Sequence, residues 1–143
     1  MGMVLLLFLG CKNEVKNEVV SEEIIETETP VIDMHNSQNS LDWAGVYSGI
    51  MPCADCEGIK TKVEIRNDET FTISQTYLGK MPENQSFDDN GSFTWDASGA
   101  IINLQAQGTT MQFQVGENKI TLLDITGKKI EGDLAEHYVL QKQ

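Results

Sequence analysis

The sequence lacks an apolar run long enough to cross a bilayer as a helix. Such a helix needs about 20 consecutive apolar residues, whereas the run Val4–Leu9 is only six residues long. Basic residues are also scarce, because 10 Lys and Arg face 22 Asp and Glu, for a net charge of −12. A surface of that sign repels phosphate backbones. The composition therefore predicts neither a spanning helix nor a nucleic-acid partner.

Motifs typical of enzymes are absent as well. The sequence has no nucleophile with a matching His and acid motif, no glycine-rich phosphate loop and no two-histidine metal motif. His137, next to Glu136, falls in a predicted terminal strand, where we expect an exposed side chain rather than a general base. The chain is therefore predicted not to be an enzyme. Its 143 residues suit one domain with flanking segments.

The start of the chain carries a short apolar run followed by Gly10 and Cys11. Phe8-Leu9-Gly10-Cys11 resembles a bacterial lipobox, where a signal peptidase cleaves before the Cys and that Cys carries the lipid. We therefore predict a signal peptide over residues 1–10 and lipidation of Cys11. The alternative is a buried apolar terminus with a chance Cys. Lys12 is not the Asp that retains many lipoproteins in the inner membrane, so we expect outer-membrane residence.

Residues 11–41 are polar and acidic. The segment lacks aromatic residues and carries seven carboxylates against two lysines. With so little apolar surface to bury, this composition is typical of a flexible tether. We therefore predict a lipidated Cys11 with its tether over residues 11–41 and a folded domain over residues 42–143.

After Leu41, short apolar stretches alternate with turn signals. Val63, Ile65, Phe71 and Ile73 alternate with polar neighbours around the turn-prone Asn67-Asp68. Similar turn signals recur about every ten residues, at Asn90-Gly91, Ser98-Gly99, Gln107-Gly108 and Gly116-Glu117-Asn118. A period of two with such spacing predicts an all-β fold. About eight strands would close into a small antiparallel barrel, which removes exposed edges.

The most unusual segment is Met51-Pro52-Cys53-Ala54-Asp55-Cys56, a predicted turn between two strands. A Cys53–Cys56 disulfide would stiffen this turn in an oxidising compartment, and three Cys, one for lipid and two for a pair, fit that assignment. A redox pair would need a lowered thiol pKa, usually given by a helix amino terminus that is not predicted here. Copper(I) prefers soft ligands, which Cys53, Cys56 and Met51 would supply, with Met81 as a further thioether.

The same segment resembles the amino-terminal domain of the NlpE lipoproteins, a family associated with copper resistance and envelope-stress signalling. The shared pattern is Tyr47-x-Gly49-x-x-Pro52-Cys53-Ala54-Asp55-Cys56-x-Gly58-Ile59. Further matches follow in the same order, at Tyr77-Leu78-Gly79, Gly91-Ser92-Phe93-Thr94-Trp95 and Leu123-Asp124-Ile125-Thr126-Gly127. The resemblance covers residues 43–141 and implies a lipocalin-like barrel tethered through Cys11. Longer members carry a second, carboxy-terminal domain, which we expect to be absent here.

The resemblance implies a membrane-anchored envelope lipoprotein that senses stress or buffers copper through the loop around Cys53 and Cys56. Its partner would be an envelope sensor or another lipoprotein. The alternative is a lipocalin-like carrier of a small hydrophobic ligand or lipid, since an eight-stranded barrel can hold one such molecule. The cavity would then be lined by Phe71, Phe93, Trp95, Phe113 and Leu122, which would equally suit a filled core.

Overall fold

The computed structural model of the protein describes residues 35–80 and 85–143. Predictions for Cys11, for Met81 and for residues 1–34 lie outside the described residues. Within the described part, no helix is long and apolar enough to cross a membrane. His35–Gln143 form one compact unit, which begins upstream of the predicted domain start at position 42.

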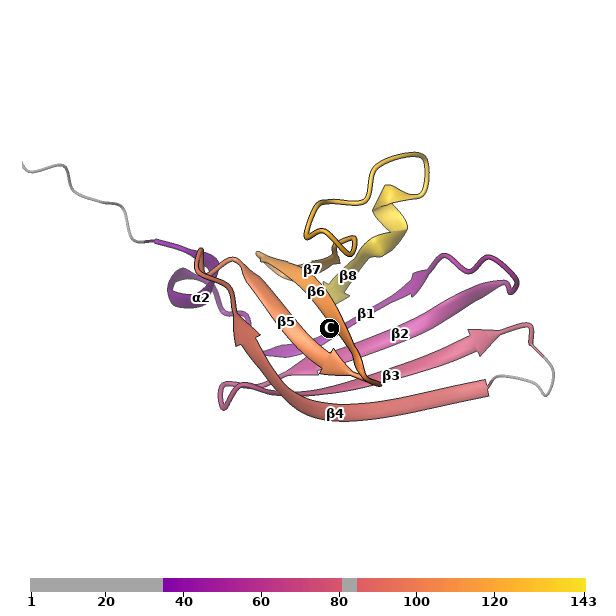
Figure 1. Ribbon diagram of the computed structural model, residues 1–143, viewed down its shortest axis with the longest axis horizontal. Helices are drawn as coiled ribbons and strands as arrows, with labels where there is room; N and C mark the ends of the chain where they lie inside the picture. Colours follow the sequence, from indigo (N-terminus) through magenta and orange to yellow (C-terminus); the bar gives the residue numbers. More distant parts are fainter. Residues whose placement is uncertain (1–34, 81–84) are drawn as a thin grey trace, which may run out of the picture. The chain divides into compact units, whose positions relative to one another are not determined.

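This unit is a closed barrel of eight antiparallel strands (Figure 1). Each strand pairs with the next one along the chain, and the last strand pairs with the first. The strands are β1 (Gly45–Met51), β2 (Gly58–Ile65), β3 (Thr70–Leu78), β4 (Gln85–Trp95), β5 (Ile101–Ala106), β6 (Thr109–Gly116), β7 (Lys119–Leu122) and β8 (Val139–Lys142). Helix α2 (Ser37–Ser40) precedes β1, and the 3-10 helix η1 (Ala135–Tyr138) precedes β8. The predicted all-β antiparallel barrel is therefore confirmed.

Alternate residues of each strand point inward and fill the barrel, as the period of two predicts. Phe71, Phe93 and Phe113 are at most 2% exposed, and so are Tyr47 and Leu140. Further buried side chains come from β2, β3, β5, β6 and β7: Val63, Ile65, Ile73, Ile102, Leu104, Val115 and Ile120. Trp95 and Leu122 are partly buried against this core. Of the two uses considered for these apolar residues, the structure shows a filled core.

One end of the barrel is covered by α2 and by Trp43. Ser37 Oγ donates to Val115 O at 2.7 Å, and Gln38 N donates to Gly99 O at 2.9 Å. The ring of Trp43 meets Phe93 and Trp95 edge to face, with centroids 5.9 and 5.3 Å apart. These contacts explain why the compact unit includes residues that the composition alone assigned to the tether.

The predicted turns at Asn67-Asp68, Ser98-Gly99, Gln107-Gly108 and Gly116-Glu117-Asn118 each connect two strands. The turn predicted at Asn90-Gly91 is wrong, because both residues lie inside β4. Gly91 is paired with Phe71 of β3, and a Cβ at position 91 would lie 3.2 Å from Phe71 Cε1. This glycine gives the phenylalanine ring room in the core and does not reverse the chain.

The strands are paired unevenly, and this positions the candidate site. β4 pairs with β3 from Gln85 to Ser92 but with β5 only from Phe93 to Trp95. β1 pairs with β2 along its whole length but with β8 only at Tyr47 and Ser48. Strands β1–β4 therefore extend past the others, and the β1–β2 connection lies at that extended end (Figure 1).

Candidate functional site

The CxxC loop, residues 52–57, connects β1 to β2. Its two ends are fixed by the sheet, because Met51 pairs with Ile59 and Glu57 N donates to Leu78 O of β3 at 3.1 Å. Gly58 follows the loop with a φ of 154°, and a Cβ there would lie 2.6 Å from Ile50 Cγ2. Only glycine meets both conditions, so the loop starts and ends at defined positions.

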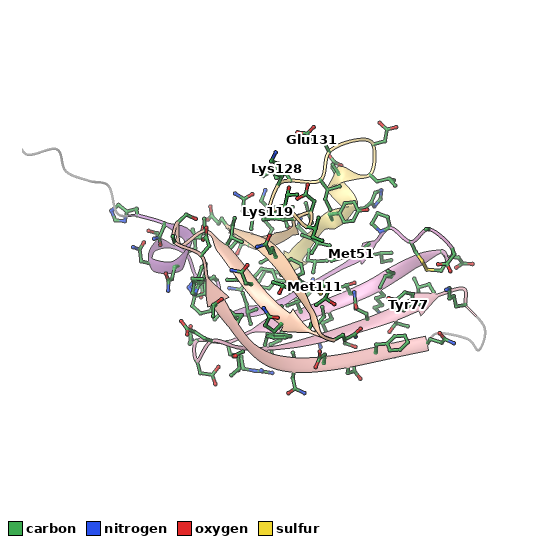
Figure 2. The ribbon with its side chains drawn as sticks, viewed as in Figure 1. Met51, Tyr77, Met111, Lys119, Lys128 and Glu131 are labelled. Carbon is green, nitrogen blue, oxygen red and sulfur yellow. A yellow bond between two sulfur atoms is a disulfide. The ribbon has the colours of Figure 1, made fainter. Side chains whose placement is uncertain are left out.

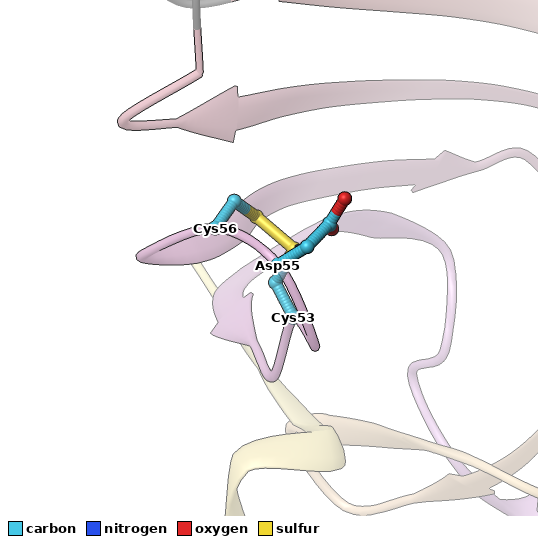
Figure 3. A group of neighbouring side chains, drawn as sticks. All are labelled: Cys53, Asp55 and Cys56. Carbon is cyan, nitrogen blue, oxygen red and sulfur yellow. A yellow bond between two sulfur atoms is a disulfide. The ribbon is translucent and has the colours of Figure 1, made fainter.

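Cys53 and Cys56 are joined by a disulfide, with their Cα atoms 5.3 Å apart (Figure 3). Cys53 Sγ lies 3.5 Å from Asp55 Oδ1, and Cys56 Sγ lies 3.4 Å from Gly58 O. Neither contact is a hydrogen bond, because a disulfide sulfur carries no hydrogen. The two sulfurs and a carboxylate oxygen of Asp55 lie within 4.8 Å of one another. Reduction would turn this group into a compact set of two thiols and one carboxylate.

Asp55 is also bound by Lys80, which lies just after β3. Lys80 Nζ is 2.6 Å from Asp55 Oδ2, and this hydrogen bond together with the lysine charge lowers the pKa of Asp55. Both side chains are solvated, so the pair adds little to stability. It does keep a carboxylate anion beside the cysteines. A neighbouring anion raises a thiol pKa, which is unlike the low thiol pKa of a thioredoxin-type pair.

A cavity of about 300 Å³ adjoins the CxxC loop. Met51, labelled in Figure 2, is only 4% exposed and contributes to its wall. Two apolar side chains that are more than half exposed flank it, Ile50 and Leu134. The complete lining is Ile50, Met51, Pro52, Cys53, Glu57, Leu134 and His137. The cavity thus brings together residues from β1, from the loop and from the segment before β8.

His137 lines this cavity although the sequence places it far from the CxxC loop. It was predicted in a terminal strand, but the structure places it in η1, with His137 N donating to Leu134 O at 3.0 Å. The helix begins where Ala135 N donates to Gly132 O at 3.1 Å, and Gly132 has a φ of 108°. In the sequence, Gly132-Asp133 indicates a turn at this point, because glycine readily adopts the positive φ of a chain reversal. That turn precedes η1 and delays the start of β8.

The filled interior weighs against carriage of a ligand inside the barrel. Phe71, Phe93 and Phe113 come from three different strands and occupy the space that a bound molecule would need. The candidate site among the described residues is therefore the CxxC loop with its adjoining cavity. Together they define a class of protein, a small closed β-barrel with a solid core and a cysteine-pair site outside it.

The NlpE N-terminal domain family matches residues 47–133, a span that includes both Cys53 and Cys56. The match covers more than half of the chain, and the chain belongs to this family. The curated lipoprotein NlpE of Escherichia coli K12 is 26% identical over 137 residues, which is 96% of this chain and 52% of that protein. The chain thus spans about half of the length of this relative.

Two crystal structures resemble the barrel. A candidate lipoprotein from Shewanella oneidensis is 43% identical, with a TM-score of 0.67 over 76% of this chain and 95% of that one. The Cpx pathway activator NlpE from Escherichia coli is 30% identical, with a TM-score of 0.54 over 62% of this chain and 46% of that one. At these identities the likeness supports a common family as well as a common fold.

Proposed function

We propose that this protein is a lipid-anchored lipoprotein of the bacterial envelope that senses envelope stress and signals to a Cpx-type pathway. The family match carries the proposal, because it includes the CxxC loop and because one relative is described as the Cpx pathway activator. NlpE of Escherichia coli is described both as a lipoprotein and as a pathway activator, and not as an enzyme. The partner would be an envelope sensor protein.

The anchor in this proposal is Cys11, after removal of residues 1–10 as a signal peptide. The lipobox-like Phe8-Leu9-Gly10-Cys11 supports it, and so does the description of the Escherichia coli relative as a lipoprotein. Each buried methylene contributes about 0.8 kcal/mol, so several acyl chains would hold the protein firmly to a membrane. Lys12 supports the outer membrane as its location.

The signal in this proposal is copper(I), bound by Cys53, Cys56 and Met51 in the reduced protein. Thiolates and thioethers are the ligands that copper(I) prefers, and the two sulfurs are already held in one turn. Met51 lines the cavity next to Cys53. Oxidation to the disulfide removes both thiolates, so the same loop would respond to the redox state of the envelope.

A Cpx reporter in Escherichia coli cells that lack their own NlpE tests this function. We expect the protein to raise reporter output, with a further rise when copper is added. Cys11→Ala should abolish both rises, because the protein loses its anchor. Cys53→Ser with Cys56→Ser should abolish only the copper-dependent rise. The matched control is Ser92→Ala with Thr94→Ala, two exposed positions on β4, which should respond like the wild type.

Two different outcomes would contradict two different parts of this function, the signalling and the sensing site. No reporter output from any form would contradict signalling to a Cpx-type pathway. A copper response that survives in the double Cys variant would remove the CxxC loop as the sensing site.

A further inference from the structure

Asp55 is the carboxylate of the CxxC loop that lies beside both cysteine sulfurs. Its Oδ1 is 3.5 Å from Cys53 Sγ, and a carboxylate oxygen of Asp55 and the two sulfurs all lie within 4.8 Å of one another (Figure 3). Glu57, the other acidic residue of the loop, is not part of this group. In residues 35–80 and 85–143, no other group of three His, Cys, Asp or Glu side chains is close enough to hold a metal ion.

The Asp55 carboxylate is held through its other oxygen. Lys80 Nζ is 2.6 Å from Asp55 Oδ2, whereas it is Oδ1 that lies beside Cys53. Carboxylates that bind a metal commonly take a hydrogen bond of this kind, which orients them. Lys80 comes close because Gly79, with a φ of 72°, turns the chain after β3, and a Cβ there would lie 2.7 Å from Glu57 Cγ. One carboxylate oxygen is thus occupied, and the other faces the cysteine pair.

The donor atoms and their charge favour zinc(II) once the disulfide is reduced. Zinc binds Cys sulfur and Asp oxygen, whereas copper(I) prefers thiolates and thioethers. Two thiolates balance a divalent ion, and Asp55 with Lys80 is a neutral pair, so zinc(II) gives a site without net charge. Copper(I) in the same place would leave one negative charge. Asp55 is exposed, so water has access as the fourth ligand of a tetrahedral zinc.

We propose that the reduced CxxC loop binds zinc(II) through Cys53, Cys56 and Asp55. This goes beyond the proposed function, because it needs neither copper nor a signalling partner. A dithiol first reduces the Cys53–Cys56 disulfide: the S–S bond breaks, each sulfur takes up a hydrogen, and the dithiol is itself oxidised to a disulfide. Zinc(II) then displaces the two thiol protons, and Asp55 Oδ1 supplies the oxygen ligand. The oxidised loop has no thiolates and should not hold zinc.

The test is the zinc(II) affinity of the chain carrying Cys11→Ser, which leaves Cys53 and Cys56 as the only thiols. After reduction with dithiothreitol and its removal under nitrogen, affinity is measured by competition with a chromophoric zinc chelator. Asp55→Asn is expected to weaken zinc binding by at least about tenfold, because even the loss of a group that only orients a metal ligand costs about 10- to 100-fold. The matched control is Glu57→Gln, which removes the same charge from the same loop and should bind zinc like the parent chain.

Copper(I) provides a second readout that a general disturbance of the loop would not reproduce. Asp55→Asn should bind copper(I) as tightly as the parent chain, since copper(I) does not need the carboxylate. Cys53→Ser with Cys56→Ser gives the background zinc binding of the remaining acidic side chains. Cobalt(II), a coloured substitute for zinc, should show thiolate-to-metal absorption in the parent chain and none in this double variant.

The outcomes separate this inference from the proposed function. If Asp55→Asn binds zinc as Glu57→Gln does, or loses zinc and copper(I) equally, Asp55 is no zinc ligand and the inference is wrong. If the reduced parent chain binds zinc no more tightly than the double Cys variant does, the loop is no zinc site. A reporter that ignores copper, together with zinc binding that depends on Asp55, would contradict the proposed copper signal and support this inference.

Discussion

Tyr47 links the barrel core to the chain that enters it. Its side chain is fully buried, and its hydroxyl donates to Trp43 O at 2.6 Å. Burial, and to a lesser degree the charge of Asp42, raises the pKa of Tyr47 to about 12 from 10.0. The hydroxyl is thus both a structural hydrogen-bond donor and a group that resists ionisation.

Replacing Tyr47 by Phe should therefore lower stability. We expect a loss of about 1–2 kcal/mol in the free energy of unfolding, measured with urea at pH 7, because the part-buried carbonyl of Trp43 loses its partner. Because the folded pKa lies above the unfolded one, the tyrosine contributes its full stabilisation below pH 10.0 and loses it as the pH rises towards about 12. The free energy of unfolding of Tyr47→Phe should therefore fall less than that of the wild type between pH 10.0 and about 12. Tyr77→Phe is the control, and an equal effect of both changes would contradict the assignment.

Asp124 organises the long segment between β7 and η1. Its Oδ1 accepts hydrogen bonds from Lys128 N, from Thr126 Oγ1 and from Thr126 N, at 3.0, 2.7 and 2.8 Å. The backbone hydrogen bond from Lys128, followed by that from the Thr126 side chain, lowers the pKa of Asp124 below 3.8. The carboxylate therefore takes the place of a regular secondary structure in this segment.

Acid should lower the stability that Asp124 gives to this segment. The folded pKa of Asp124 lies below the unfolded one, so its stabilisation is present above about pH 4 and is lost as the pH falls through the folded value. Thermal unfolding between pH 7 and pH 3 measures this loss, and Asp124→Ala should lose less over that range than the wild type. Asp88→Ala, at an exposed position of β4, should behave like the wild type. An equal acid loss in all three forms would show that Asp124 contributes nothing.

The sequence predicts where the strands of this fold lie better than it predicts which residues face each other across the sheet. Apolar alternation identifies the inward face of a strand because that signal is local. Asn90-Gly91 misleads because the same dipeptide serves tight turns and close packing, and only the position of Phe71 across the sheet decides between them. The candidate site divides in the same way. Cys53 and Cys56 are visible in the sequence, whereas the tertiary fold alone brings Lys80 to Asp55 and His137 into the adjoining cavity.

The barrel as a whole should depend little on its disulfide. Cys53 and Cys56 close a loop of only a few residues, so the chain-entropy argument gives the bond about 2 kcal/mol or less. Removing one core ring, as in Phe113→Ala, should cost about 3–5 kcal/mol. Urea unfolding of the oxidised, the reduced and the Phe113→Ala protein compares these losses. A reduced protein that is unfolded in the absence of urea would contradict this expectation and make the disulfide a requirement for the fold.

The seam between β1 and β8 differs from every other pairing in the barrel. It consists of Tyr47 with Lys142 and Ser48 with Gln141, whereas the other seven pairings join strands that follow one another in the chain. Six of those pairings join strands that short connections link, and β7 and β8 are linked through the longer segment with η1, but this seam must bring together the two ends of the domain. We therefore expect this seam to form last during folding and to be the first place where the closed barrel opens. Since η1 leads directly into β8, whatever holds η1 in place should also set how often the barrel opens.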